Sequence, residues 1–167
     1  HPIDRFVMAT LRDRGLNMAP PAQPNRLIRR LYLDLTGLIP PPEVVKNFSA
    51  NPSDQHYRQI VDQLLDDEQH GVRWAKFWPD LVRYADSDGY SADSYRDEAW
   101  RYRDYVIDSF NHNRPYDQFI QQQLAGDELE PMNQQAQIAT GFLRHWIYEF
   151  NQRDAKSQWD IILNDIT

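Results

Sequence analysis

The pattern of apolar positions along the chain predicts helices throughout. Apolar side chains recur three and four residues apart, which places them on one face of an α-helix. The clearest stripes contain Leu27, Ile28, Leu31, Tyr32 and Leu35, and then Tyr57, Ile60, Val61, Leu64 and Leu65. Alternating strand-like runs and Asn-Gly hairpin turns are missing from the sequence. The sequence therefore predicts an all-α fold.

Capping and breaking residues divide the chain into seven to nine short helices. We expect the first helix to end near Gly15, the second to be capped by Asn25 and stopped by Gly37, and a later one to be capped by Ser53. Pro79 lies inside a helical run, where its missing amide donor predicts a kink or a fresh helix start. The expected helical ranges are 2–14, 25–36, 42–48, 53–65, 70–85, 99–111, 116–125, 134–146 and 154–166, with a loop over 86–97.

The composition points to a core built from large rings. Only 41% of the residues are hydrophobic, but they include five Trp, nine Tyr and seven Phe. Each ring can bury on the order of 150–250 Å². We expect an irregular multi-helix fold around an aromatic core, with 1–167 forming a single domain of a larger multidomain protein. The side chains expected to face inward include Trp74, Trp78, Leu81, Tyr102 and Phe110.

Charge and cysteine content exclude several kinds of partner. The net charge is −7 and the sequence has no basic stripe for phosphates, which argues against nucleic acid as a partner. No apolar run approaches the roughly 20 residues needed to cross a bilayer, so no membrane span is expected. The absence of cysteine excludes disulfides, zinc–thiolate sites and covalent c-type haem attachment within these residues.

The segment from Tyr84 to Glu98 is the most unusual part of the chain, because carboxylates and tyrosines share one loop. Asp86, Asp88, Tyr90 and Asp93 are candidate ligand or ion residues. Calcium binds several oxygens around a tight turn, although the spacing to Gly89 is too short for an EF-hand. Alternatively, these acids form a solvated loop in which Asp and Ser cap neighbouring helices.

A polysaccharide ligand is a further hypothesis for the same loop. Glycoside hydrolysis needs two carboxyl groups, one as acid and one as base or nucleophile. Asp86 and Asp88 could supply that pair, with Tyr90 beside them. Many other pairs exist among 25 acidic residues, so sequence spacing does not fix the choice.

Arginines and rings alternate at the start of the helix that follows. Trp100, Arg101, Arg103 and Asp104 are interpreted as a structural network, because helical spacing also pairs Arg101 with nearby acids. An anion or ligand clamp is the alternative, since guanidinium planes stack on rings and grip carboxylates.

The remaining motifs identify no catalytic residue. The histidines do not form a His-Glu-x-x-His zinc motif, and the chain has neither a Gly-x-Ser-x-Gly elbow nor a Gly-rich phosphate loop. His145 and the other histidines are interpreted as lone surface or satisfied polar residues. Catalytic residues and a metal site are therefore left unassigned.

Four blocks of sequence resemble a known family. They are residues 29–40 (RRLYLDLTGLIP), residues 73–90, residues 99–127 with the run AWRYRD and the ending QLAGD, and residues 138–144 (IATGFLR). Together they resemble the planctomycete cytochrome-c-associated domain, also called the domain of unknown function 1549. The resemblance covers nearly the whole chain.

The resemblance carries its own expectations. It implies an exported or periplasmic multidomain protein of Planctomycetes whose adjacent domains are the partners of this one. It also implies a Cys-x-x-Cys-His segment beyond the position equivalent to Thr167, which would attach a c-type haem in the parent protein but not in these residues. Polysaccharide is a further possible partner, because carbohydrate-binding modules accompany some family members.

This sequence departs from the family pattern at two positions. Phe77 stands where the family often has His, so a ligand role at that position is not carried over. Pro79 stands where the family usually has Leu, so the local helix geometry is expected to differ.

Overall fold

The computed structural model describes residues 1–89, 93–145, 156, 159–160 and 163. Within them the all-α prediction is confirmed, and the chain forms no strand. The expected helix over 154–166 falls almost entirely outside the described residues. The elements are α1 (Pro2–Asp13), α2 (Pro24–Leu35), α3 (Pro42–Ala50), α4 (Asp54–Leu65), α5 (Glu68–Ala75), α6 (Phe77–Leu81), α7 (Ala99–Asn111), α8 (Tyr116–Leu129), α9 (Gln134–Ala139) and the 3₁₀-helix η1 (Thr140–Arg144).

Local sequence signals account for most helix ends. Ser53 caps α4 as predicted, with its hydroxyl accepting a hydrogen bond from the amide of His56 at 3.2 Å. Gly37 follows α2 with φ of 74°, a left-handed conformation that costs glycine little. The prediction that Asn25 caps α2 is wrong. The helix starts one residue earlier at Pro24, because the fixed φ of proline suits the first helical position.

Pro79 coincides with a fresh helix start, one of the two predicted outcomes. α5 ends at Ala75, and α6 begins at Phe77, two residues before the proline. The proline therefore lies in the first turn of α6, where the amide of a residue has no intrahelical acceptor to lose.

The C-terminal helices differ from the predicted ranges. α8 continues past Gly126 to Leu129, with a kink at Ala125, whose φ is −151°. The position requires glycine, because a Cβ there would collide with the backbone carbonyl of Ala136 in α9. The expected helix over 134–146 is shorter, since α9 ends at Ala139 and tightens into η1.

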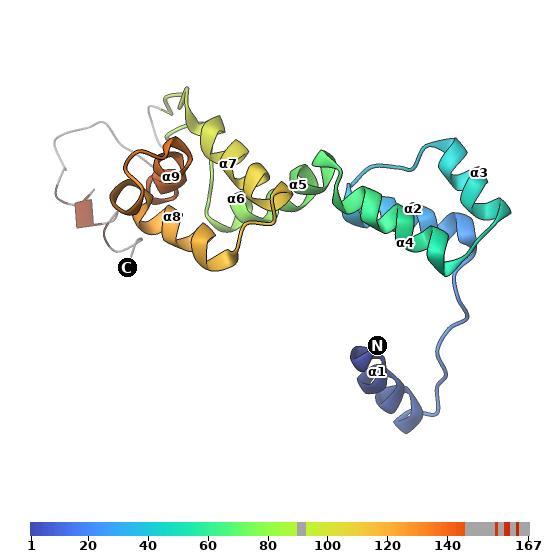
Figure 1. Cartoon of the computed structure of the whole chain (residues 1–167). Helices are drawn as coiled ribbons and strands as arrows, with labels where there is room; N and C mark the ends of the chain where they lie inside the picture. Colours follow the sequence, from blue (N-terminus) through green and yellow to red (C-terminus); the bar gives the residue numbers. More distant parts are fainter. Residues whose placement is uncertain (90–92, 146–155, 157–158, 161–162, 164–167) are drawn as a thin grey trace.

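The buried side chains of the described residues form two clusters instead of one interior. The first contains Ile28, Leu31, Phe48, Ile60 and Leu64 of α2, α3 and α4. The second is rich in rings and contains Ala75, Tyr102, Tyr105, Val106, Phe119 and Ala139. α5 lies between them and contacts α7 on one side and α2 and α4 on the other (Figure 1).

Several predicted core positions are wrong. Trp74 is 40% exposed, Phe110 37% and Leu81 71%. The helix register explains Phe110, because α7 packs through Tyr102, Tyr105, Val106 and Ser109, which leaves Phe110 at the edge of the buried face. Trp74 and Leu81 are not among the side chains that pack against the ring-rich cluster.

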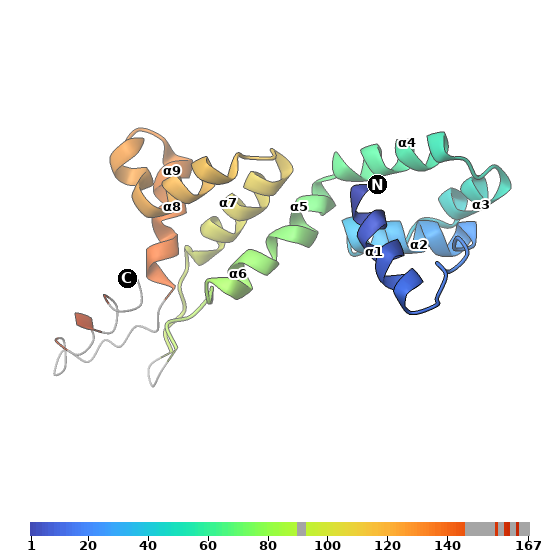
Figure 2. The same cartoon turned by 90° about the horizontal axis from the view of Figure 1, so that it is seen from below.

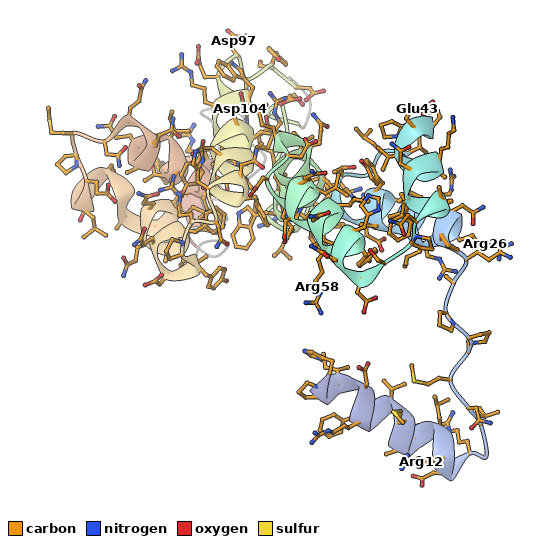
Figure 3. All side chains as sticks on the ribbon, turned by 45° about the vertical axis from the view of Figure 1, so that its right-hand side comes forward. Arg12, Arg26, Glu43, Arg58, Asp97 and Asp104 are labelled. Atoms are coloured by element: carbon orange, nitrogen blue, oxygen red, sulfur yellow. The ribbon has the colours of Figure 1, made fainter. Side chains whose placement is uncertain are left out.

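The first helix stands apart from the rest of the chain. α1 buries none of its side chains, and the segment after it leads to α2 without helical structure (Figures 1 and 2). Arg12 near its end lies far from Arg26 at the start of α2 (Figure 3). Among the described residues, no helix is both long and apolar enough to cross a bilayer.

Candidate functional site

The acidic loop, residues 84–98, joins α6 to α7 as a short hairpin-like excursion. Ser87 and Tyr95 form an isolated antiparallel bridge. The amide of Asp88 donates to the carbonyl of Ser94 at 2.9 Å, and the amide of Arg96 donates to the carbonyl of Asp86 at 2.8 Å. The residues described within the predicted loop, 86–89 and 93–97, contain no helix, as predicted, and these hydrogen bonds hold the two ends of the loop together.

The candidate acids of this loop have separate partners. The carboxylate of Asp86 accepts from the Tyr84 hydroxyl at 2.7 Å, and that of Asp93 accepts from the amide of Gly89 at 2.9 Å. Asp88 is buried and pairs with the guanidinium of Arg96 at 2.6 Å. Tyr90 lies outside the described residues. Each of the three acids is thus used to shape the loop.

These contacts concern the two hypotheses for the loop, a calcium site and a sugar-cleaving pair of carboxylates. In the described part of the chain, no three His, Cys, Asp or Glu side chains gather as a metal site would require. Asp88 is bound to Arg96, so it could serve with Asp86 as an acid–base pair only after leaving that guanidinium. A calcium ion and a sugar-cleaving pair at this loop both stay predictions.

The predicted arginine and aromatic network lies on the first turns of α7. Arg101 pairs with Glu98, three residues before it, and its guanidinium lies 5.4 Å from the ring centre of Trp100. Arg103 donates to Asp104 through Nε at 3.0 Å and through Nη2 at 2.8 Å. Trp100 is 43% exposed, so these residues form a surface network at the edge of the fold.

A cleft of about 560 Å³ opens between the acidic loop, the start of α7, and α9 with η1. We call it the loop–helix cleft. Three arginines and three carboxylates line it, together with a tyrosine and a histidine: Arg96, Arg101, Arg144, Asp88, Asp97, Glu98, Tyr102 and His145. Its volume suits a small-molecule ligand.

His145 lies on the wall of this cleft with a strongly perturbed pKa. Its ring packs against Tyr102, with the centres 4.4 Å apart, and against Tyr84 and Phe142. Burial among these rings, reinforced by the positive charge of Arg96, lowers the pKa of His145 to about 4. Its Nδ1 atom is buried and has no hydrogen-bond partner within the described chain. The imidazole is therefore neutral at pH 7.

A known protein family matches almost the whole chain. Residues 2–167 match the family PSCyt2, Protein of unknown function (DUF1549). The chain belongs to this family. No curated protein and no solved structure matches the chain. Membership of PSCyt2 confirms the resemblance.

Sequence reasoning did not identify His145 as a site residue. It follows Arg144 directly after the run IATGFLR, and a lone histidine in that position carries no metal or catalytic spacing. Its contact with Tyr102 arises from the packing of η1 against α7, and no sequence pattern reports that. The one available signal is its position beside a block with family resemblance.

Proposed function

We propose that this PSCyt2 domain is a helical docking module of an exported, haem-linked multidomain protein, and that the loop–helix cleft receives the haem-bearing segment. The observation that carries the proposal is the imidazole of His145 on the wall of a cleft that also presents arginines, with a buried Nδ1 that has no hydrogen-bond partner among the described residues. Neutral imidazole is the form of histidine that binds metals, and it is a common ligand of haem iron.

The charges around the cleft support a ligand with carboxylate groups. Arg101 and Arg144 both line the cleft, one from α7 and one from η1. Guanidinium groups bind carboxylates through paired hydrogen bonds, and haem carries two propionates. Asp88 pairs with Arg96 and Glu98 pairs with Arg101, so a propionate at Arg101 would replace Glu98 as its partner.

Aromatic rings around His145 would keep water from the bound group. Tyr102 lines the cleft, and Tyr84 and Phe142 pack against the His145 ring. Low polarity around a haem raises the cost of charge on the iron and so tunes its reduction potential. A c-type haem supplies one-electron transfer when bound, while the residues of this chain would orient it and exclude solvent.

A haem peptide provides a direct test. The probe is a short peptide with a Cys-x-x-Cys-His motif and covalently attached haem, in which one axial position of the iron is open. We expect it to bind this chain with a shift of its Soret band. His145→Ala should abolish the shift, and Arg144→Ala should weaken binding because a propionate partner is lost.

The matched control is His112→Ala. His112 lies at the end of α7, and its side chain is 74% exposed. This variant should shift the Soret band as the unmodified chain does. An equal loss in both variants, or no shift with the unmodified chain, would reject haem docking at this cleft.

A further inference from the structure

A second groove runs along the outer face of α7 and has a different composition. It has a volume of about 420 Å³ and lies between α7 and the first turn of α9. We call it the α7/α9 groove. Trp100, Asp104 and Asp108 line it from α7, and Gln134 and Gln135 line it from α9. The proposed haem docking does not use this groove.

The spacing of the α7 residues makes the groove linear. Trp100, Asp104 and Asp108 are four residues apart, so they lie on one face of the helix. At 1.5 Å rise per residue, this row is about 12 Å long. Asp104 projects from the middle of α7, and Asp97 lies beyond its N-terminal end (Figure 3). The row suits an extended ligand better than a compact one.

The row combines a half-exposed ring with groups that bond hydroxyls. Trp100 is 43% exposed, and the guanidinium of Arg101 lies 5.4 Å from its ring centre, so a sugar would stack on the part of the ring that Arg101 leaves open. Gln134 and Gln135 are exposed, and their amides both donate and accept hydrogen bonds. The carboxylates of Asp104 and Asp108 accept hydrogen bonds. A pyranose ring presents apolar C–H faces and a rim of hydroxyls, which matches both features.

The charges of the groove are balanced. Asp104 pairs with Arg103 at 2.8 Å, Arg101 pairs with Glu98, and Asp108 lies 3.6 Å from the guanidinium of Arg114. A strongly charged ligand would need an excess of the opposite charge, and the groove offers none. An uncharged polyhydroxyl ligand meets no such requirement.

We infer that the α7/α9 groove binds a neutral pyranose oligosaccharide, with Trp100 as the stacking platform. Gln135 and Asp104 would bond the hydroxyl rim. The groove is a binding subsite and involves no bond cleavage. It is separate from the proposed haem docking and does not depend on it, although Arg101 and Ile138 line both cavities.

Calorimetry with defined oligosaccharides tests the inference on the full chain. The probes are the hexasaccharides of β-1,4-glucan, β-1,3-glucan, β-1,4-mannan and β-1,4-xylan. We expect at least one to bind and to change the tryptophan fluorescence. Trp100→Ala should weaken that binding by about tenfold, and Trp100→Phe should retain part of it because a ring face is kept.

Trp74→Ala is the matched control. Trp74 is exposed to a similar extent, 40% against 43%, but lies on α5 away from the groove. It should leave the affinity unchanged, and Gln135→Ala should lower it without affecting the haem-peptide titration. The inference fails if none of the four hexasaccharides binds, if Trp74→Ala weakens binding as much as Trp100→Ala, or if sulfated or uronic oligosaccharides bind instead.

Discussion

The indole Nε1 of Trp78 donates to the hydroxyl of Tyr102 at 2.9 Å and so links two cavities of the domain. Tyr102 lines the loop–helix cleft, whereas Trp78 lines a smaller cavity of about 220 Å³ beside Phe119. Gln123 accepts hydrogen bonds from both, at 2.9 Å from the indole and 2.5 Å from the hydroxyl. This triad connects α6, α7 and α8 inside the ring-rich cluster.

Trp78→Phe should destabilise the domain by about 1–3 kcal/mol, because it removes a buried donor and leaves a smaller ring in its place. The Tyr102–Gln123 hydrogen bond would remain, which limits the cost. Urea unfolding followed by circular dichroism measures the change. Trp74→Phe, at a half-exposed site, should cost less than about 0.5 kcal/mol. Equal effects of the two substitutions would contradict the importance of the triad.

Gly126→Ala should destabilise the contact between α8 and α9. The added Cβ would collide with the carbonyl of Ala136, and a backbone atom cannot swing aside as a flexible side chain does. We expect a loss of about 2 kcal/mol or more. Gly141→Ala is the control, since its Cβ would lie 3.4 Å from the ring of Tyr102, close to an ordinary packing distance. The account is wrong here if Gly141→Ala costs as much.

Stability should fall on acidification through His145. The folded pKa is about 4, below the usual value of 6.5. The unfolded imidazole therefore takes up a proton first as the pH drops below about 6.5, which favours unfolding until the folded pKa is also passed. Between pH 7.5 and 5.0 this group should account for about 2 kcal/mol at most. Unfolding of His145→Gln at both pH values measures it, because the variant lacks this part of the pH dependence. An unchanged dependence would show that His145 is not buried as neutral imidazole.

Removal of residues 1–16 should leave the unfolding free energy of the remaining chain unchanged within about 0.5 kcal/mol, because α1 buries no side chain. Ile28→Ala provides the contrast. Ile28 is fully buried in the cluster of α2–α4, so this substitution should cost about 2–4 kcal/mol. A large loss on removing α1 would mean that the helix packs on the body in solution.

The sequence was sufficient to predict the helices and most of their ends, since caps and periodic stripes are local. Ser53, Gly37 and Pro79 act within one turn of their own positions. The two clusters were not predictable in the same way, because a stripe shows that a face is buried and not which helix covers it. Tyr105 is 1% exposed, yet its spacing alone did not distinguish it from the exposed Phe110.

The candidate site was predicted only in part. The acidic loop was recognised from its composition, and Asp86, Asp88 and Asp93 lie in it as expected. Their partners depend on tertiary contacts or loop geometry that spacing does not give, as with the pairing of Asp88 to Arg96. Gln123 was missed for a similar reason. A glutamine within a polar run is expected to be exposed. Its burial is favourable here because Trp78 and Tyr102 donate hydrogen bonds to its side chain.

The most direct test of the haem-docking proposal is the absorption spectrum of this chain extended by the Cys-x-x-Cys-His segment that the family resemblance implies, produced in a host that attaches c-type haem. We predict a Soret band whose position changes in His145→Ala and is unaffected in His112→Ala. A colourless protein, or a haem spectrum that is identical with and without the His145 imidazole, would contradict the proposal.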